Sequence, residues 1–203
     1  MYRMSIITML CPPALASRLD LARCTRMALV HDMAESLVGD ITPVDGVTKS
    51  EKNRREAETM DYLCTSLLGN VHDGAAGRQM REVWQEYEDS RTPESHFVHD
   101  VDKMELLLQM MEYERSHQGR IDLSEFSWVA GRISLPEVQA WAAELLKERD
   151  AFWAGQKQQG GEGKDGVAQL SEERRQQQDE YYGNGDRVEH VDVVPKATAQ
   201  KQA

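Results

Sequence analysis

A short stretch of the chain, ALVHDMAESLVGD, holds four side chains that can bind a metal ion. These are His31, Asp32, Glu35 and Asp40, which lie within ten residues of one another in an otherwise apolar run. Because an α-helix turns once every 3.6 residues or so, His31 and Glu35 are expected on one face, one turn apart. Imidazole and carboxylate groups together suit Mg²⁺, Mn²⁺, Co²⁺ or Zn²⁺. The stretch therefore indicates a site for a divalent cation.

Each of these residues also has an ordinary structural explanation when it is taken alone. A histidine can be partly buried in a core, and a carboxylate can lie on a solvated helix face. Charged side chains are seldom kept beside an apolar surface without partners, however. The four residues together therefore favour a metal site over simple packing.

The overall charge limits the kinds of partner that the protein can have. The chain has 203 residues and a formal net charge of −11, with 35 acidic against 24 basic side chains. This balance argues against binding to a nucleic acid polymer, which requires clustered Lys and Arg. It does not argue against a small phosphorylated substrate, because a metal ion can supply positive charge locally.

The cysteines and the apolar runs indicate where the protein acts. Cys11, Cys24 and Cys64 are scattered and form no CxxC pair, which is typical of reduced intracellular thiols. No apolar run approaches the ~20 residues that span a bilayer. We therefore expect a cytoplasmic or nuclear protein without a membrane partner.

The apolar spacing predicts an all-α fold of about six packed helices and no confident strand. Thr48 with Glu51 forms a capping-box pattern at one helix start, and Thr92 followed by Pro93 marks another. The buried faces include Met27, Val30, Ala34 and Leu37 in the second helix and Trp84 in the fourth. The predicted helices cover residues 1–10, 19–38, 48–68, 75–87, 94–117 and 134–152.

The character of the chain changes at Gly155. The segments QKQQGGEGKDG and EERRQQQDEYYGNGD are rich in Gln, Gly and charge and have almost no apolar periodicity. Such segments cannot bury enough surface to offset the entropy lost on ordering. We therefore predict one domain over residues 1–154 and a disordered polar tail over 155–203.

Three segments of the chain resemble a known family. RCTRMALVHDMAESLVGDITPVD, then KNRREAE, then FVHDVDKMELLLQMMEYE are similar to the HD-domain phosphohydrolases, and more narrowly to their eukaryotic 5′-deoxynucleotidase branch. The resemblance extends over about residues 1–154. It implies an HD-domain helical bundle, a divalent metal cofactor, a homodimer, and hydrolysis of deoxynucleoside 5′-monophosphates to deoxynucleoside and phosphate.

The resemblance also implies which residues bind the metal. His31 and Asp32 match the histidine–aspartate pair that gives the family its name. A later aspartate completes the family's site, and helical geometry alone does not choose between Asp100 and Asp102, which both flank an apolar stripe. The resemblance selects Asp102.

A second acidic set in this branch corresponds to Glu35, Asp40 and the carbonyl of Ile41. The resemblance implies that this set binds an additional ion or positions the attacking water and the sugar. Glu35 is the candidate for orienting the water or binding a second metal, and Asp40 for contacting substrate.

One departure from the family's pattern keeps other functions open. The family's first histidine ligand normally lies just before the residues that match Met1, so we expect weak or no activity from the chain as given. The alternatives are a catalytically inactive interaction protein with this fold, or an HD phosphohydrolase acting on cyclic nucleotides or triphosphates. The basic residues Lys52, Arg54 and Arg55 could hold phosphate, but ion pairs along a solvated helix face explain them better.

Overall fold

The computed structural model describes residues 1–42 and 45–158, and every regular element in these ranges is helical. The predicted all-α fold is therefore confirmed. In chain order the elements are α1 (Tyr2–Met9), α2 (Pro13–Ala16), α3 (Leu21–Val30), α4 (Glu35–Val38), α5 (Lys49–Asp61), the π-helical η2 (Tyr62–Leu67), α6 (Ala75–Asp89), α7 (Pro93–Ser116), the 3₁₀-helical η3 (Ser124–Arg132) and α8 (Pro136–Gln158).

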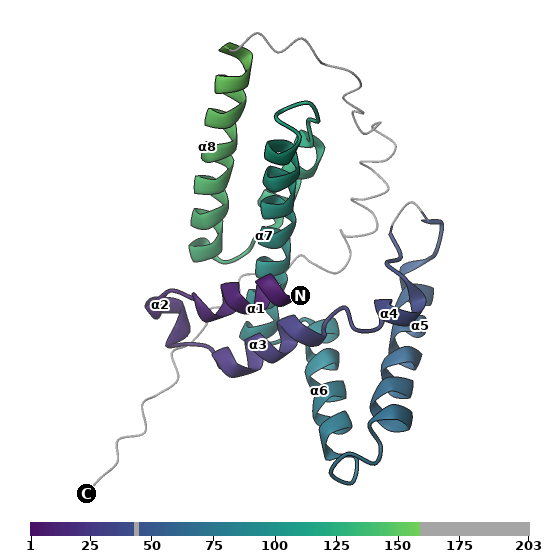
Figure 1. Cartoon of the computed structure of the whole chain (residues 1–203). Coiled ribbons are helices and arrows are strands. Elements are labelled where there is room, and N and C mark those ends of the chain that lie inside the picture. Colours follow the sequence, from purple (N-terminus) through teal and green to yellow (C-terminus); the bar gives the residue numbers. More distant parts are fainter. Residues whose placement is uncertain (43–44, 159–203) are drawn as a thin grey trace, which may run out of the picture.

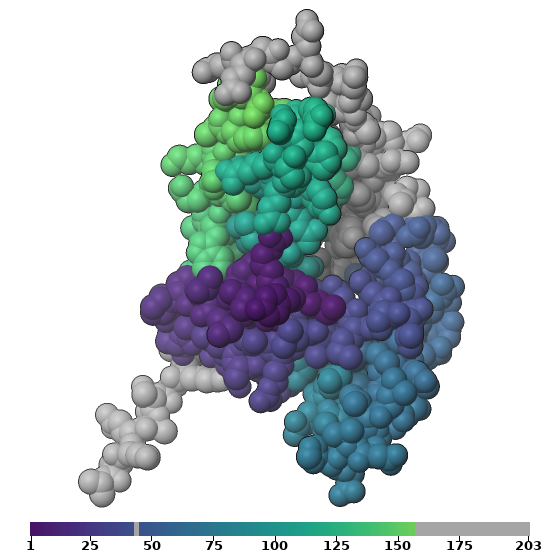
Figure 2. Space-filling model, in the orientation of Figure 1, coloured from purple at the N-terminus to yellow at the C-terminus, as the bar shows by residue number. Residues whose placement is uncertain are grey.

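Helix α7 is the centre of the fold. Helices α1, α3, α6, α8 and η3 all pack against it, and Figure 1 shows α8 running alongside it while α1 and α3 cross near its lower part. Figure 2 shows α1 on the outside of the molecule, between the α7–α8 part and α3. Fully buried side chains of α7 include Phe97, Val98, Val101 and Leu107. The central helix therefore carries both the core and, as described below, part of the candidate site.

Two helix starts follow the predicted capping chemistry. At α7, the Thr92 hydroxyl accepts a hydrogen bond from the Ser95 backbone N–H at 3.1 Å, and the Ser95 hydroxyl accepts one from the Thr92 N–H at 3.1 Å. Pro93 occupies the first turn, where no backbone donor is needed. At α5, the Thr48 hydroxyl accepts from the Glu51 N–H at 3.3 Å. Local sequence is thus sufficient to place both helix starts.

The predicted helix over residues 19–38 is wrong in one respect, because it is interrupted after Val30. The His31 carbonyl accepts a hydrogen bond from the Trp84 indole at 3.0 Å, while the Glu35 N–H donates to the Asp32 carbonyl at 3.1 Å. This tighter turn replaces the α-helical bond between residues 31 and 35. Leu37, predicted to be buried, is 60% exposed as a result.

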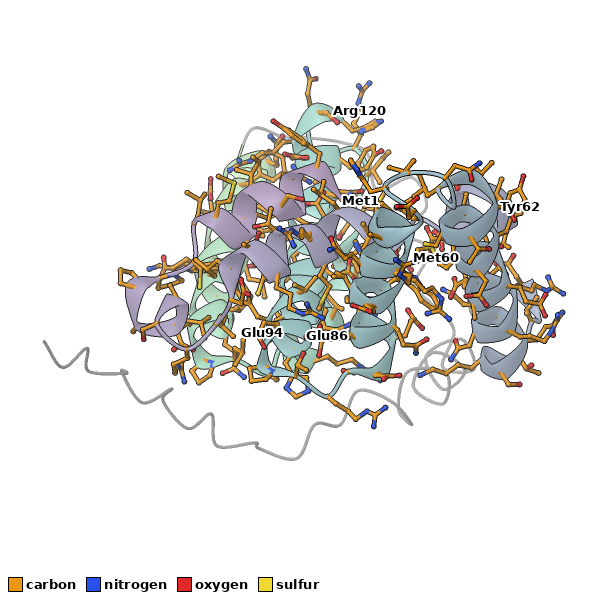
Figure 3. The ribbon with its side chains drawn as sticks, turned by 90° about the horizontal axis from the view of Figure 1, so that it is seen from below. Met1, Met60, Tyr62, Glu86, Glu94 and Arg120 are labelled. Carbon is orange, nitrogen blue, oxygen red and sulfur yellow. The ribbon has the colours of Figure 1, made fainter. Side chains whose placement is uncertain are left out.

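The start of α3 is fixed by carboxylates from two other helices. Asp20 caps the helix by accepting from the Arg23 N–H at 3.0 Å, and its own N–H donates to Glu94 of α7 at 2.9 Å. Glu86 of α6 forms an ion pair with Arg23. Glu94 and Glu86 are labelled in Figure 3, on the side of the molecule where α3 lies. These contacts set the position of α3, and hence of the residues at its other end.

Three further differences concern segments with weak periodicity. The short helix α2 lies where a loop was predicted, η3 was not predicted, and the end of the helix predicted to reach residue 68 is the π-helical η2. Helix α8 continues to Gln158, past the predicted boundary at residue 154. The remainder of the predicted tail, residues 159–203, lies outside the described residues.

Candidate metal centre

His31 lies at the C-terminal end of α3, and its ring is buried. The residue is 3% exposed, and Nδ1 lies 3.2 Å from the Ala28 carbonyl oxygen. A carbonyl oxygen only accepts hydrogen bonds, so this contact places the proton of the neutral ring on Nδ1. Histidines that bind metals commonly donate their other ring N–H to a carbonyl in this way. The second nitrogen, Nε2, is thereby left for a ligand.

Nε2 of His31 faces two carboxylates that come from different parts of the chain. It lies 2.9 Å from Oδ2 of Asp32 and 3.8 Å from Oδ1 of Asp102 on α7. Within the described residues this buried nitrogen makes no well-directed hydrogen bond. The two carboxylate side chains are 41% and 46% exposed, respectively. The arrangement is a buried nitrogen donor beneath two solvent-facing oxygen donors, which suits a divalent cation.

The electrostatics of this group are those of a site with excess negative charge. Burial alone would lower the pKa of His31, but its contacts with Asp102 and Asp32 outweigh burial and raise that pKa to about 9. Burial alone would raise the pKa of Asp102, but the contact with His31 lowers it. Within the described part of the chain, no group of three or more His, Cys, Asp or Glu side chains is already arranged to hold a metal ion. A bound cation would take the place of the ring proton on Nε2.

The structure separates the two aspartates between which helical geometry did not choose. Asp100 is 1% exposed and accepts hydrogen bonds from the Ser134 N–H and hydroxyl at 3.0 Å and from the Leu135 N–H at 2.7 Å. It therefore holds the segment that leads into α8. Asp102 faces His31 instead, which favours it as the metal ligand.

The second acidic set lies just beyond the break in the helix. Glu35 begins α4 and is half-buried, and burial, followed by the charges of Asp32 and Asp40, raises its pKa to about 7. Asp40 is exposed and follows Gly39, whose φ of +79° is readily accessible only to glycine. Ile41 is 7% exposed. Glu35 therefore lies close enough to Asp32 and Asp40 for their negative charges to raise its pKa.

Comparison with known proteins identifies the family to which this site belongs. Residues 1–141 match the family model described as "HD domain". The chain belongs to the HD-domain family. His31 and Asp32, which the sequence resemblance matches to the family's histidine–aspartate pair, are called the HD pair below. The predicted resemblance is therefore confirmed at the level of the family.

Relatives in this HD-domain family cover most of the chain. The chain is 44% identical over 158 residues to the 5′-deoxynucleotidase hdd1 of Schizosaccharomyces pombe, which is 78% of either chain. It is 39% identical over 150 residues to the human 5′-deoxynucleotidase HDDC2, or 73% of this chain and 70% of that one. A solved structure, that of the HD domain-containing protein YGK1, matches with a TM-score of 0.58 and 38% identity, covering 75% of this chain and 74% of that one.

Around the HD pair, the structure adds two carboxylates that the sequence did not single out. Glu56 of α5 is 6% exposed and lies 3.6 Å from the Lys52 ammonium, and burial raises its pKa. Burial, followed by the charge of Glu56, raises the pKa of Glu88 of α6 to about 7. Both sense the charge of Asp32. Nothing in the charged run of α5 distinguishes Glu56 from its solvated neighbours, so only the fold could show its burial.

The basic residues of α5 form ion pairs within their own helix. Arg54 binds Glu51 at 2.8 Å and Glu58 at 2.6 Å, and Arg55 binds Glu51 at 2.7 Å. These pairs follow the i,i+3 and i,i+4 spacing of a solvated helix face. The solvated-face interpretation of Arg54 and Arg55 is supported by these contacts.

Proposed function

We propose that the protein is a metal-dependent 5′-deoxynucleotidase that hydrolyses deoxynucleoside 5′-monophosphates to deoxynucleoside and inorganic phosphate. The observation that carries this proposal is the buried His31 ring, whose Nε2 faces Asp32 and Asp102 without a directed hydrogen bond. The relatives hdd1 and HDDC2, which are named 5′-deoxynucleotidases, share 44% and 39% identity with the chain. The His31 arrangement supports metal-assisted chemistry, and the relatives support the substrate class.

His31, Asp32 and Asp102 would hold the metal ion. HD-domain phosphohydrolases generally depend on divalent metals, and we propose Mn²⁺, Co²⁺, Mg²⁺ or Zn²⁺ here. When bound, the ion would polarise a phosphoryl oxygen and lower the pKa of a coordinated water. The nitrogen ligand would be Nε2 of His31. The Ala28 carbonyl holds the His31 ring in place through its contact with Nδ1.

Glu35 and Asp40 would act on the water and the substrate. Glu35 stands one short turn beyond the HD pair, half-buried, and is our candidate for orienting the attacking water or binding a second ion. Asp40 is exposed in the following loop, where it can reach the sugar, and the neighbouring Ile41 carbonyl would complete this second set. A carboxylate orients a water effectively only within hydrogen-bonding reach.

The proposal is tested by phosphate release from a panel of nucleotides with each metal in turn. Any phosphate release from deoxynucleoside 5′-monophosphates should require added metal, and metal-free protein should release none. Cleavage of a cyclic nucleotide, or release of triphosphate from a nucleoside triphosphate, would assign the chain to another HD phosphohydrolase activity. Metal binding without hydrolysis of any nucleotide would overturn the enzymatic proposal and favour an interaction protein with this fold.

We also propose that the protein is a cytoplasmic or nuclear homodimer. The dimer rests on the family resemblance, and the location on the three unpaired cysteines, which are buried. Within residues 1–42 and 45–158, no helix combines the length and apolarity that a membrane span requires. Light scattering coupled to gel filtration gives the oligomeric state directly, and a monomer at micromolar concentration would contradict the dimer.

A further inference from the structure

A column of three rings stands behind the HD pair. The Tyr87 ring of α6 lies 4.9 Å from the His31 ring, centroid to centroid, at an interplanar angle of 57°. On its other side Tyr87 stacks against His99 of α7, with centroids 3.9 Å apart and an angle of 29°. Tyr87 is 8% exposed. The tyrosine ring is therefore enclosed between the proposed metal ligand and a second imidazole.

The outer imidazole of this column is itself held in place. His99 Nε2 lies 3.0 Å from the Tyr87 carbonyl oxygen, and the His99 carbonyl accepts a hydrogen bond from Lys103 at 3.2 Å. Because His99 is tied to the backbone of Tyr87, the ring of Tyr87 has little room to rotate away from His31. The column thus places the Tyr87 ring, tilted, against the His31 ring.

Helix α6 also holds the backbone of His31. Trp84, one turn before Tyr87, donates its indole N–H to the His31 carbonyl at 3.0 Å, and it is 2% exposed. With the Nδ1 contact to the Ala28 carbonyl, His31 is held at its backbone carbonyl, at one ring nitrogen and by the tilted contact with the Tyr87 ring. The only ring position left for a ligand is Nε2, which faces Asp32 and Asp102.

We propose that Tyr87 is a positioning residue, whose ring holds the His31 imidazole in the orientation that presents Nε2 to the metal. A histidine ring can rotate about its terminal side-chain bond, since that torsion has a broad profile. A flat aromatic ring beside the imidazole restricts this rotation. A flexible aliphatic side chain of similar volume would not restrict it to the same extent. The inference rests on the proposed metal centre, and it does not depend on nucleotidase activity.

The test compares Tyr87→Phe with Tyr87→Leu in the full chain, with Mn²⁺ alone as the probe. Loss of a group that orients a metal ligand typically weakens metal binding by about 10-fold to 100-fold, and we expect a loss in this range for Tyr87→Leu. Tyr87→Phe, which keeps the ring, should retain most of the Mn²⁺ affinity of the wild type. Val138→Ala is the matched control, since it removes buried volume from α8, far along the chain, where Val138 is 0% exposed; it should lower the melting temperature without weakening Mn²⁺ binding.

Calorimetric Mn²⁺ titration and melting temperature are measured on every variant, and the His31 ring is followed by long-range ¹H–¹⁵N NMR. If Tyr87→Leu does not fold, Tyr87→Met replaces it, because methionine fills the volume without a ring. Equal Mn²⁺ affinity in wild type and Tyr87→Leu would overturn the proposal, as would an equal loss in Tyr87→Phe. Normal Mn²⁺ binding by the wild type with no phosphate release would reject the proposed function while leaving this inference open to the same comparison.

Discussion

Helix α7 carries two acidic side chains in opposite situations. Glu114 is 0% exposed and fully paired: its carboxylate accepts from Arg149 at 2.7 and 2.8 Å, from the Trp153 indole at 3.1 Å and from the Leu123 N–H at 2.8 Å. Asp102, about three turns earlier on the same helix, has a side chain 46% exposed and lies 3.8 Å from His31.

The difference separates a charge that serves the fold from charges that we propose serve a ligand. At Glu114, hydrogen bonds from Leu123, just before η3, and from Arg149 and Trp153 of α8 offset the free-energy cost of burying the charge. Asp102 instead shares the His31 imidazole with Asp32, and both carboxylate side chains are partly exposed to solvent. A buried group whose pKa is shifted by specific charge partners, as that of His31 is raised by Asp102 and Asp32, is typical of functional sites. The predictions below test this contrast, from the largest expected effect to the smallest.

Replacing Glu114 with alanine should destabilise the fold strongly. It would leave the Arg149 guanidinium buried without its main partner, and breaking a buried pair in this way costs about 3–5 kcal/mol. Urea unfolding monitored by circular dichroism measures the change. The neighbouring Arg115→Ala is the control: Arg115 pairs with Glu148 near the surface, where such pairs contribute about 0–1 kcal/mol. Equal losses from both variants would contradict the contrast.

Replacing Glu35 with glutamine should lower activity and leave the fold intact. A carboxylate that orients or deprotonates the attacking water typically contributes at least about 100-fold to the rate. We expect kcat for deoxynucleoside monophosphate hydrolysis to fall accordingly, with the melting temperature and Mn²⁺ affinity little changed. A parallel loss of Mn²⁺ affinity would make Glu35 a metal ligand, and unchanged kcat would remove it from the mechanism.

Replacing Asp100 with alanine should cost stability but not metal binding. The carboxylate accepts from Ser134 and Leu135 at the start of α8, and leaving such buried donors unpaired costs about 1–3 kcal/mol. Unfolding in urea measures this loss, and kcat per folded molecule should stay at the wild-type value. A variant with normal stability and no Mn²⁺ binding would exchange the roles of Asp100 and Asp102.

Replacing Arg54 with alanine should change almost nothing. Its ion pairs with Glu51 and Glu58 are on the exposed face of α5, where screening by water and salt weakens them. The melting temperature and KM should both match the wild type. A marked rise in KM at unchanged kcat would instead make Arg54 part of the phosphate site.

The sequence was sufficient for features that depend on local chemistry. Thr92 and Thr48 cap the helices they were predicted to cap, because capping involves only residues three positions apart. Trp84 was predicted to face inward and is 2% exposed. The HD stretch and the downstream aspartate helix were sufficient to predict the family.

The sequence could not predict features that depend on contacts between distant segments. The helix break after Val30 follows from the indole of Trp84, 53 residues beyond His31, binding the His31 carbonyl. Helical periodicity alone placed Asp100 and Asp102 equally well, and in the structure they are distinguished by the contacts of Asp100 with Ser134 and Leu135 and of Asp102 with His31. The stacking of Tyr87 between His31 and His99 likewise requires α3, α6 and α7 to be in place.

The central claim is that His31, Asp32 and Asp102 form a metal centre, and Mn²⁺ titration of three proteins tests it most directly. We compare the wild type with Asp102→Asn and with Asp100→Ala, each confirmed to be folded by circular dichroism. We predict one Mn²⁺ site in the wild type and in Asp100→Ala, and loss of that site in Asp102→Asn. Undiminished Mn²⁺ binding by Asp102→Asn would contradict the account.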